Sequence, residues 1–242
     1  MTQKLTLITG GSRGIGYAVA RELARNGQNV VIVGQTEESA LAGQARLASE
    51  GVTVHAFGCD VADPVEVAEL ATKVAALGDV EILINSAAVM SERTAKTLKT
   101  TTEEWNRVMG INLDGVFHMV AAFATPMTDR RSGRIINVSA CLGRMSGPGT
   151  SGGLAPYRIS KAAVNALTKN LAAETNFGKR GVFVDAMCPN HTRTDMGGPD
   201  APRSPEEAAD TIVWLATRDT VDADGNVVET GLLWEDRQIV PW

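Results

Sequence analysis

The chain has 242 residues, of which 44% are hydrophobic and 21% are charged, and its formal net charge at pH 7 is -5. A chain of this length and apolar content can bury a full core, which excludes an intrinsically disordered protein. The negative charge balance gives no general attraction to nucleic acid or to acidic membranes, so neither is expected as a partner.

The three cysteines, Cys59, Cys141 and Cys188, are odd in number and widely spaced. They match neither a disulfide framework nor a zinc site, so no metal is expected, and free thiols in a reducing compartment are the plain interpretation. The chain opens on a short strand rather than a signal peptide, and no apolar run approaches the ~20 residues that span a bilayer. We therefore expect a cytoplasmic protein.

Apolar, β-rich runs alternate with helical periodicity along the chain. In chain order the expected elements are strand 5–9, helix 14–26, strand 30–33, helix 37–50, strand 52–57, helix 64–77, strand 82–84, helix 103–126, strand 134–138, helix 156–177, strand 182–187 and helix 205–216. Strands that alternate with helices of this length form a parallel sheet with helices on both faces.

Right-handed crossovers between such strands give a doubly wound α/β sheet, the Rossmann fold. The chain contains no internal repeat and no low-complexity linker, so we expect one domain over residues 1–242. Two glycine-rich irregular stretches, 139–156 and 190–204, follow strand ends, where ligands bind in this fold class. The second stretch defines an expected substrate loop around residues 190–205.

The turn between the first strand and the first helix reads Thr-Gly-Gly-Ser-Arg-Gly-Ile-Gly over residues 9–16. Gly10 permits a tight turn, Gly14 allows close approach to a diphosphate, and Gly16 lets helix and strand pack closely. The helix N-terminus adds amide donors and the positive end of a dipole. Because a strand precedes the loop and a helix follows it, a dinucleotide site is favoured over a plain glycine turn. The expected contacts are Gly10, Ser12, Arg13, Gly14, Ile15 and Gly16.

The end of the second strand discriminates between the two nicotinamide dinucleotides. An Asp or Glu there would bind the adenosine ribose and repel a 2′-phosphate, but this chain has Gly34 and Gln35. Gln35 can donate a hydrogen bond, and Arg13 offers a positive charge for the phosphate. Glu37 and Glu38 lie just beyond and weigh against a phosphate, although acids there also favour a helix N-terminus. NADP(H) is therefore expected, with NAD(H) as the alternative.

Tyr157 and Lys161 lie four residues apart near the start of a predicted helix and share one of its faces. A tyrosine needs help to act as an acid or base near neutral pH, because its unperturbed pKa is about 10. A nearby ammonium group lowers that pKa, and Lys161 could supply it while it binds ribose hydroxyls. Alone, such a pair usually marks an amphipathic helix surface, so its significance depends on the glycine loop upstream.

These motifs and several others occur in the order typical of one enzyme family. The others are Asp60-Val61, Asn-Ser-Ala-Ala at 85–88, Asn112 in Ile-Asn-Leu-Asp-Gly, Ile-Asn-Val-Ser-Ala at 136–140 and Cys-Pro-Asn-His-Thr-Arg-Thr at 188–194. Over nearly its full length the chain resembles a classical short-chain dehydrogenase/reductase. Its C-terminal part, with the motifs at 193–199, 203–210 and 239–242, is similar to the carbonyl-reductase-like branch.

The resemblance implies a role for each matching residue. Asp60 would bind the adenine amino group, Asn85 would support the sheet beneath the cofactor, and Asn112 would hold a water in a proton relay. Tyr157 would exchange a proton with the substrate oxygen, and Lys161 would bind the nicotinamide ribose. The other implied cofactor contacts are Val61, Ala87, Pro189, Thr192 and Thr194. Asp60 and Asn112 also have a plain structural interpretation, because Asp and Asn often cap helices and turns.

The chain departs from this family at the catalytic serine, which is the second residue of a Ser-Ser pair after the fifth strand. Alignment over residues 135–138 places Ala140 there, beside Ser139. Loss of a donor to the substrate oxygen slows a reaction on the order of 100- to 1000-fold. Ser139 remains a catalytic candidate if a local bulge turns it inward, since neighbouring strand residues point to opposite faces. The other candidate donors are Ser146, Ser151, a bound water and the substrate itself.

Two further motifs also differ. The usual Asn-Asn-Ala-Gly is Asn-Ser-Ala-Ala here, so the methyl group of Ala88 lies where glycine normally permits close approach of a cofactor. Pro189-Asn190 replaces Pro-Gly, and because asparagine tolerates left-handed geometry we expect the turn to survive. His191 follows near the expected nicotinamide. It is either a substitute acid or base or a solvent-facing loop residue, and the second is favoured.

The favoured function is an NADP(H)-dependent oxidoreductase that transfers hydride between the nicotinamide and the carbonyl carbon of a small organic substrate, with Tyr157 as acid or base. The substrate would lie between residues 141–156 and a mobile lid at 196–204. Apolar side chains that suit a pocket, but pack a core equally well, are Leu142, Met145, Leu154 and Met196.

Two alternatives stay open. Ala140 motivates a diverged member that binds NADP(H) but catalyses a cyclisation, rearrangement, dehydration or unusual reduction. A dinucleotide-binding regulator without catalysis is disfavoured by the retained Tyr157 and Lys161. The resemblance also implies a homodimer or homotetramer, whose interface would use the predicted helices 103–126 and 156–177, rich in alanine and other apolar residues.

Overall fold

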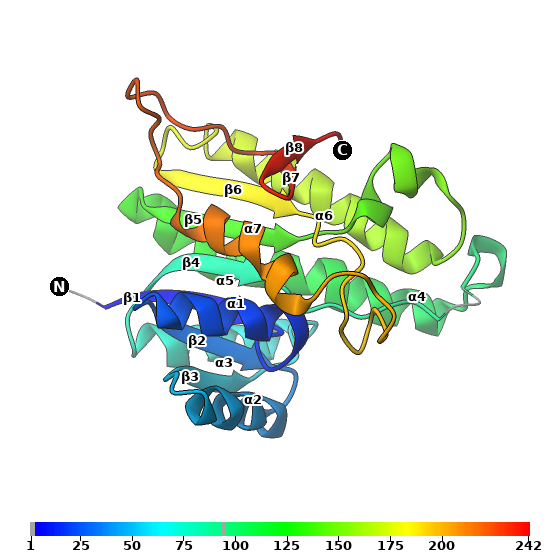
Figure 1. Ribbon diagram of the computed structural model, residues 1–242, viewed down its shortest axis with the longest axis horizontal. Helices are drawn as coiled ribbons and strands as arrows, with labels where there is room; N and C mark the ends of the chain where they lie inside the picture. The colour runs from blue at the N-terminus through cyan, green and yellow to red at the C-terminus, as the bar shows by residue number, and fades with distance from the viewer. Residues whose placement is uncertain (1–2, 93–94) are drawn as a thin grey trace.

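Short apolar strands separated by helices build one sheet in the order β3-β2-β1-β4-β5-β6-β7-β8 (Figure 1). The computed structural model describes residues 3–92 and 95–242. The strands are β1 (Lys4–Thr9), β2 (Asn29–Gly34), β3 (His55–Gly58), β4 (Asp79–Asn85), β5 (Gly133–Val138), β6 (Val182–Met187), β7 (Leu233–Glu235) and β8 (Gln238–Val240). Strands β1 to β7 pair in parallel, and β8 pairs antiparallel with β7.

The helices alternate with the strands, as the periodicity predicts. The α-helices are α1 (Gly14–Arg25), α2 (Glu37–Ser49), α3 (Pro64–Ala75), α4 (Thr102–Met109), α5 (Gly115–Arg130), α6 (Ala155–Glu174) and α7 (Pro205–Thr217). Shorter turns are η1 (Thr97–Lys99), the π-turn η2 (Gly110–Asp114), η3 (Cys141–Gly143) and η4 (Gly147–Thr150). Local sequence sets several helix starts: Thr36 and Ser204 form capping boxes, and Pro64 occupies the first turn of α3.

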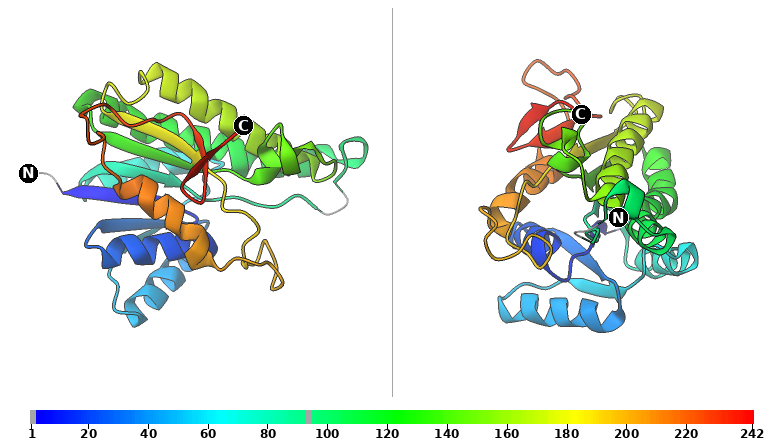
Figure 2. Two further views of the ribbon diagram at one scale, coloured as in Figure 1. Left: turned by 45° about the horizontal axis from the view of Figure 1, so that its top comes forward. Right: turned by 90° about the vertical axis from the view of Figure 1, so that its right-hand side faces the viewer.

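Both faces of the sheet are covered by helices (Figure 2). Leu7, Leu83 and Ile135 belong to the core beneath α3, α5 and α6. Ile8 and Ile84, one residue further along their strands, belong to the core beneath α1, α2 and α7. Strands that are apolar on both faces are typical of parallel sheets. The expected doubly wound α/β fold is therefore confirmed.

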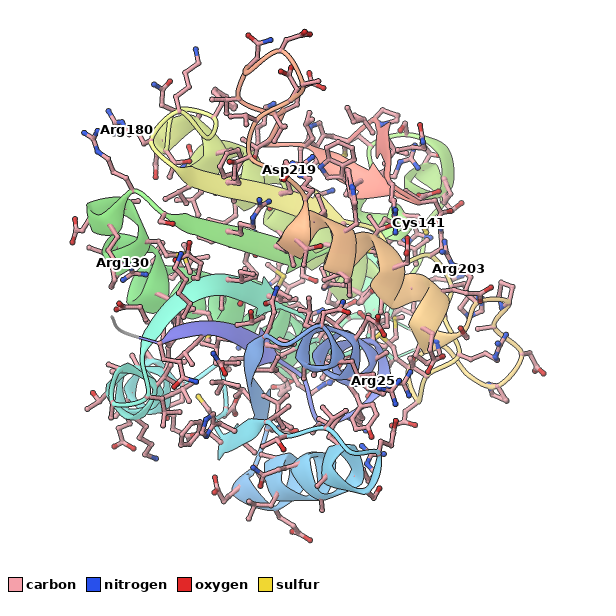
Figure 3. All side chains as sticks on the ribbon, turned by 60° about the vertical axis from the view of Figure 1, so that its left-hand side comes forward. Arg25, Arg130, Cys141, Arg180, Arg203 and Asp219 are labelled. Atoms are coloured by element: carbon pink, nitrogen blue, oxygen red, sulfur yellow. The ribbon has the colours of Figure 1, made fainter. Side chains whose placement is uncertain are left out.

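The chain reverses its direction of travel across the sheet at β1, which pairs with β2 on one side and β4 on the other. Ligands in this fold class bind beyond the carboxyl ends of the strands at such a point. Figure 3 shows Cys141 and Arg203 at that end, with Arg130 and Arg180 at the opposite end. The segments after β1, β4, β5 and β6 therefore share one edge.

Two predictions about the elements are wrong. The predicted helix 103–126 is divided by the π-turn η2, and α5 continues to Arg130 with Pro126 inside it. A single wide turn hardly changes the apolar periodicity, so the sequence pattern does not reveal it. Strands β7 and β8 lie outside the predicted elements, because runs of three residues are too short to show alternation.

The helical stretch Thr102–Arg130 is also long and apolar enough to cross a membrane by length and composition alone. This corrects the expectation that no apolar run approaches that length. The stretch supplies core residues, however: Met119, Phe123 and Met127 are buried against the sheet. Core helices pass the same test, so the finding is weak evidence for a membrane span.

A buried ion pair attaches the C-terminal strand β7 to the sheet. Arg218 donates to Asp185 at 3.0 Å, and its guanidinium lies about 5 Å from the ring centroids of Trp214 and Trp234. Asp185 also accepts a hydrogen bond from the Trp234 indole at 3.0 Å. Such a pair needs these additional contacts to offset desolvation. The network holds β7 and β8 beside the carboxyl end of β6.

Candidate active site

The glycine loop after β1 folds as a tight turn against the segment after β4. Gly10 has a φ of 65°, and a Cβ atom on it would lie 3.0 Å from the Cα atom of Ala87. A Cβ atom on Gly16 would lie 2.4 Å from the Gly10 carbonyl oxygen. Gly14 has a φ of 58° and faces Thr194, whose Cγ2 atom would lie 3.2 Å from a Cβ. Backbone atoms therefore form much of the surface of this loop.

Helix α1 begins at Gly14 with its first amide groups open. Its N-cap residue Arg13 makes no side-chain cap, and no acidic residue lies in the first turn. In contrast, Thr36 caps α2, Asp63 caps α3 and Ser204 caps α7. The first amides of a helix lack intrahelical acceptors and carry partial positive charge. The N-terminus of α1 therefore fits an anion such as a diphosphate.

Near the end of β2, one carboxylate is engaged and one guanidinium is exposed. The Glu37 carboxylate accepts a hydrogen bond from the Gly58 amide of β3 at 2.8 Å, while Gln35 is exposed. Arg13 donates to Asp195 at 2.9 Å, across from the glycine loop to the segment after β6. Both side chains of that pair remain largely in solvent, so Arg13 presents an accessible positive charge.

The other expected cofactor residues lie around the same crevice. Asp60 accepts a hydrogen bond from the Ala62 amide at 3.0 Å, which is the capping role that its residue type allows. Asn85 donates to Asn137 at 2.9 Å, and its Oδ1 atom is buried without a partner in the described part of the chain. A bound ligand or water would satisfy such an acceptor. Five further expected contacts are buried or half-buried: Ser12, Ile15, Val61, Pro189 and Thr192.

Asn112 lies in the π-turn η2 and is fully buried. Its Nδ2 donates to the carbonyl oxygen of Val89 at 2.9 Å, and its Oδ1 accepts from the amide of the same residue at 2.8 Å. Nδ2 also donates to Ser160 Oγ at 3.1 Å. Asn112 therefore connects the α4–α5 stretch, the segment after β4 and helix α6. A π-turn within an α-helix frequently marks a functional site.

Tyr157 and Lys161 both face inward from α6, with 7% and 2% of their surfaces exposed. Tyr157 packs with Val108 and Ala140 in a small apolar cluster. Leu142 and Leu154 pack against this cluster, together with Val89 and Met90. Met145 and Met196 are 76% and 39% exposed and lie outside this cluster.

The expected lowering of the tyrosine pKa by Lys161 does not occur in this structure. Lys161 Nζ lies 5.9 Å from the centroid of the Tyr157 ring and donates to the Val138 carbonyl at 2.7 Å. Burial raises the pKa of Tyr157, and nearby Cys188 and Cys141 raise it further. Burial also lowers the pKa of Lys161 to about 8. Helix α6 places Tyr157 and Lys161 on one face, but the ammonium group of Lys161 donates to the Val138 carbonyl at the end of β5 rather than to the tyrosine.

Ser139 and Ala140 face opposite sides at the end of β5. The Ser139 hydroxyl donates to Asn165 Oδ1 at 2.5 Å and lies 3.3 Å from the Lys161 carbonyl oxygen. Ala140 packs against Tyr157. Alternation along the strand therefore brings the Ala140 methyl group to the tyrosine. The bulge that would turn Ser139 toward the substrate is not seen at the end of β5, and this arrangement argues against Ser139 as a donor to substrate.

A network of buried amides lies under the site, and the predicted site residues do not include its members Asn137 and Asn165. Asn165 accepts from Ser139 and donates to the Gly143 carbonyl at 3.2 Å, which fastens η3 to α6. Asn137 accepts from Asn85 and donates to Thr168 Oγ1 at 2.9 Å. Two signals pointed to these residues: an asparagine inside an apolar strand, and another four positions after Lys161 on the same helix face.

The segment around residues 190–205 is held by internal hydrogen bonds. Asn190 has a φ of 59°, which confirms that asparagine takes the left-handed turn. His191 is exposed, as favoured, and its Nε2 lies 2.8 Å from the Gly197 carbonyl oxygen. Arg193 donates to the carbonyl groups of Ala201 and Pro202. These bonds argue against the loose lid expected from the glycines and prolines of this segment.

Replacement of Lys161 by methionine is expected to stabilise the folded protein. Burial lowers its pKa from 10.5 to about 8, so the folded protein binds this proton more weakly than the unfolded chain does. The free energy of unfolding therefore rises between pH 8 and 10.5, and below pH 8 the penalty is on the order of 3 kcal/mol. Lys161→Met should remove most of this penalty at pH 7, as measured by urea denaturation at pH 7 and pH 10.

Lys169→Met is the matched control, because Lys169 is an exposed lysine on the same helix. Because this side chain is not buried, its replacement should not raise the free energy of unfolding at pH 7 as Lys161→Met should. A Lys161→Met protein that is no more stable than the wild type at pH 7 would mean that burial does not disfavour this ammonium group.

Known proteins resemble this chain in sequence and in fold. A model of the short chain dehydrogenase family matches residues 4–204. The chain is 32% identical to the short-chain reductase protein NovJ of Streptomyces niveus, over 92% of this chain and 93% of the relative. It is 36% identical to a 3-oxoacyl-[acyl-carrier-protein] reductase of Synechocystis, over 90% of each chain.

Solved structures agree with this relation. The crystal structure of a 3-oxoacyl-[acyl-carrier protein] reductase with bound NAD from Brucella melitensis matches with a TM-score of 0.81 and 25% sequence identity. The match covers 96% of this chain and 88% of that chain. With its family motifs in order along an eight-stranded, doubly wound sheet, the chain belongs to the short chain dehydrogenase family of oxidoreductases.

Proposed function

We propose that this protein is an NADP(H)-dependent oxidoreductase that reduces the carbonyl group of a small organic substrate. The proposal depends on one observation: an uncapped helix N-terminus and a buried tyrosine–lysine pair lie at the same end of the sheet. The glycine loop contacts the segment after β4 through Gly10 and Ala87. That segment is bonded to Asn112, whose amide reaches Ser160 on α6. Continuous contacts thus link the loop to the helix that bears the tyrosine.

The residues around this crevice are the proposed holders of the dinucleotide, and when bound its nicotinamide supplies the hydride. They are Gly10, Ser12, Arg13, Gly14, Ile15, Gly16, Gln35, Asp60, Val61, Asn85, Ala87, Pro189, Thr192 and Thr194. The open amides of α1 suit the diphosphate, and the unpartnered oxygen of Asn85 suits a further polar contact. Lys161 would give up its hydrogen bond to the Val138 carbonyl and donate to the ribose hydroxyls instead.

The residues near the end of β2 support NADP(H) over NAD(H). Gly34 and Gln35 carry no charge to repel a 2′-phosphate, and the Glu37 carboxylate is engaged by the Gly58 amide. The guanidinium of Arg13 is exposed on the glycine loop, where a phosphate would attract it. The 2′-phosphate would then compete with Asp195 for this guanidinium.

Tyr157 is the proposed proton donor. Because burial raises its pKa, the phenol keeps its proton at neutral pH. A carbonyl oxygen gains negative charge when its carbon accepts hydride, and a neutral phenol can donate the proton that this oxygen requires. The protonation state of Tyr157 therefore supports reduction over alcohol oxidation. Asn112, held by Val89 and Ser160, would position a water that returns the proton to Tyr157.

Ala140 supports a second candidate function. A methyl group stands beside Tyr157, and the neighbouring Ser139 hydroxyl is bound to Asn165, so this strand end offers no hydroxyl to a substrate oxygen. The protein would then bind NADP(H) and catalyse a cyclisation, rearrangement, dehydration or unusual reduction. Binding of NADPH without turnover of any carbonyl compound would favour this function.

The site and the surface also support proposals about partners. The apolar cluster around Tyr157 suits a small-molecule substrate with apolar groups next to its carbonyl. Phe117 on α5 and Ile159 on α6 are 55% and 41% exposed, so they suit an interface between copies in a homodimer or homotetramer. We also propose a cytoplasmic location, with no nucleic acid or membrane partner.

Replacement of Arg13 by glutamine tests the coenzyme preference. A charge-assisted hydrogen bond to a phosphate contributes about 1.5–3 kcal/mol, so NADPH binding should weaken by about 10- to 100-fold. NADH lacks the 2′-phosphate, and its binding should change little. Fluorescence titration of both reduced coenzymes measures the two dissociation constants.

Arg25→Gln is the matched control, since Arg25 is an exposed arginine at the other end of α1. It should leave both dissociation constants unchanged. Asp195→Asn, which removes the present partner of Arg13, should tighten NADPH binding. If Arg13→Gln weakened NADH and NADPH binding equally, or if the wild type bound NADH more tightly, the proposed preference would be wrong.

A further inference from the structure

Two of the three cysteines lie side by side at the wall of the candidate site. Cys141 begins η3 directly after Ala140, and Cys188 directly follows β6. Their strands are parallel neighbours, with Val138 opposite Met187. The Ser139 amide donates to the Met187 carbonyl at 2.8 Å, which continues the pairing beyond the end of β5. The chain therefore brings both cysteines to the carboxyl ends of adjacent strands.

The two thiols differ in access to solvent. Cys188 is fully buried with Ala186 and Leu233, whereas Cys141 is partly exposed and packs against this cluster with Val240 and Trp242. Figure 3 shows Cys141 beside the C-terminal strands. A reagent from solvent would therefore reach Cys141 first, because Cys188 is shielded from solvent.

Hydrogen bonding and charge also distinguish the two thiols. The side-chain hydrogen bond between the two cysteines lowers the pKa of Cys141 below its ordinary value. The same bond raises the pKa of Cys188. Of the charged groups nearby, Arg144 lowers the pKa of Cys141 and Glu235 raises it. Cys141 therefore ionises more readily than Cys188, whose thiol also donates to Asn190 Oδ1 at 3.8 Å.

Cys59 provides an internal contrast. It is buried after β3, and burial raises its pKa to about 11. Strands β2, β1 and β4 separate β3 from β5, which places Cys59 roughly 20 Å from Cys141 across the sheet. Cys59 can therefore neither react readily nor pair with Cys141.

We propose that Cys141 and Cys188 form a peroxide-reactive thiol pair that closes a disulfide bond at the wall of the active site. The Cys141 thiolate attacks one peroxide oxygen, so that an S–O bond forms, the O–O bond breaks, and the departing hydroxide takes up a proton as water. The Cys188 sulfur then attacks the sulfur of this sulfenic acid. The S–S bond forms, the S–O bond breaks, and the released hydroxide takes the Cys188 proton as a second water. The two thiols lose two electrons, and hydrogen peroxide gains them.

The bridge would act on the candidate site through η3. A Cβ atom on Gly143 would lie 2.7 Å from the Lys161 carbonyl carbon, so η3 is packed directly on the catalytic helix. Ala140, which precedes Cys141, packs on Tyr157. A bond that draws Cys141 toward Cys188 would therefore shift the wall beside the tyrosine and its lysine.

The test uses the reduced wild-type protein, equimolar hydrogen peroxide, alkylation of the remaining thiols, and trypsin digestion without reductant. Mass spectrometry should find peptide 135–144 joined to peptide 181–193, with the mass of two hydrogen atoms lost. Peptide 47–73, which carries Cys59, should be recovered with its thiol alkylated. The bridge should disappear on treatment with dithiothreitol. This readout does not depend on the proposed function, because it requires no enzyme activity.

Variants identify the order of the two steps. Cys188→Ser should stop at a sulfenic acid on Cys141, which a 1,3-dicarbonyl reagent traps, while Cys141→Ser should leave Cys188 unoxidised. Cys59→Ser is the matched control and should form the bridge as the wild type does. The proposal is overturned if peroxide leaves Cys141 and Cys188 unbridged in the wild type, or if Cys59 is oxidised as fast as Cys141.

Discussion

Replacement of Tyr157 by phenylalanine is expected to lower kcat for carbonyl reduction by about 100- to 10,000-fold, because the variant loses the proposed proton donor. The phenyl ring can still pack between Val108 and Ala140, so the fold should persist. NADPH binding should change little, since the glycine loop and the amides of α1 remain intact. Initial rates of NADPH oxidation with an aryl ketone, an aliphatic ketone and a 3-oxoacyl thioester measure kcat, and NADPH fluorescence measures binding.

Tyr17→Phe is the matched control, because Tyr17 is the other of the two tyrosines in the chain. Its hydroxyl donates to Glu50 at 2.6 Å between α1 and the end of α2, apart from the apolar cluster around Tyr157. Its kcat should match that of the wild type. A Tyr157→Phe enzyme with the wild-type rate would remove Tyr157 from the mechanism. A wild type that binds NADPH but reduces no carbonyl compound would favour the diverged function.

Much of the fold could be predicted from local sequence. Strands such as β1 and β4 are apolar on both faces, and that pattern is specific to a sheet covered on both sides. Caps and prolines such as Thr36 and Pro64 mark helix starts through contacts within one turn. The π-turn at Asn112 depends instead on Val89 and Ser160, which are distant in sequence, so no local pattern encodes it.

The candidate site divides in the same way. The glycine loop was predictable because Gly10, Gly14 and Gly16 serve backbone geometry that a short segment sets by itself. The hydrogen-bond partners of Lys161 and Ser139 could not be predicted, because several acceptors compete for each side chain and tertiary packing decides which of them is near. Lys161 binds the Val138 carbonyl, and Ser139 binds an amide on α6. Residue type and helix face limit such partners but do not select one.

Replacement of Ala140 by serine is expected to raise kcat for carbonyl reduction on the order of 100-fold, because it adds a hydroxyl where the family resemblance implies a donor to the substrate oxygen. The Ala140 methyl group already packs on Tyr157, so a hydroxyl at this position would stand beside the proton donor. Ala140 is buried in an apolar cluster, with 8% of its surface exposed, so the added hydroxyl would be largely removed from solvent. If this hydroxyl makes no hydrogen bond in the enzyme without substrate, the free energy of unfolding should fall by about 1–3 kcal/mol.

Ser139→Ala is the matched control at the adjacent position, and its outcome decides which side of the strand serves the substrate. It removes the bond to Asn165, so we expect a loss of stability of about 1 kcal/mol with little change in kcat. We therefore expect kcat to rise in Ala140→Ser and to stay close to the wild-type value in Ser139→Ala. If Ser139→Ala abolished turnover while Ala140→Ser changed nothing, Ser139 would have to leave Asn165 during the reaction. The substrate would then be bound from the opposite side of the strand.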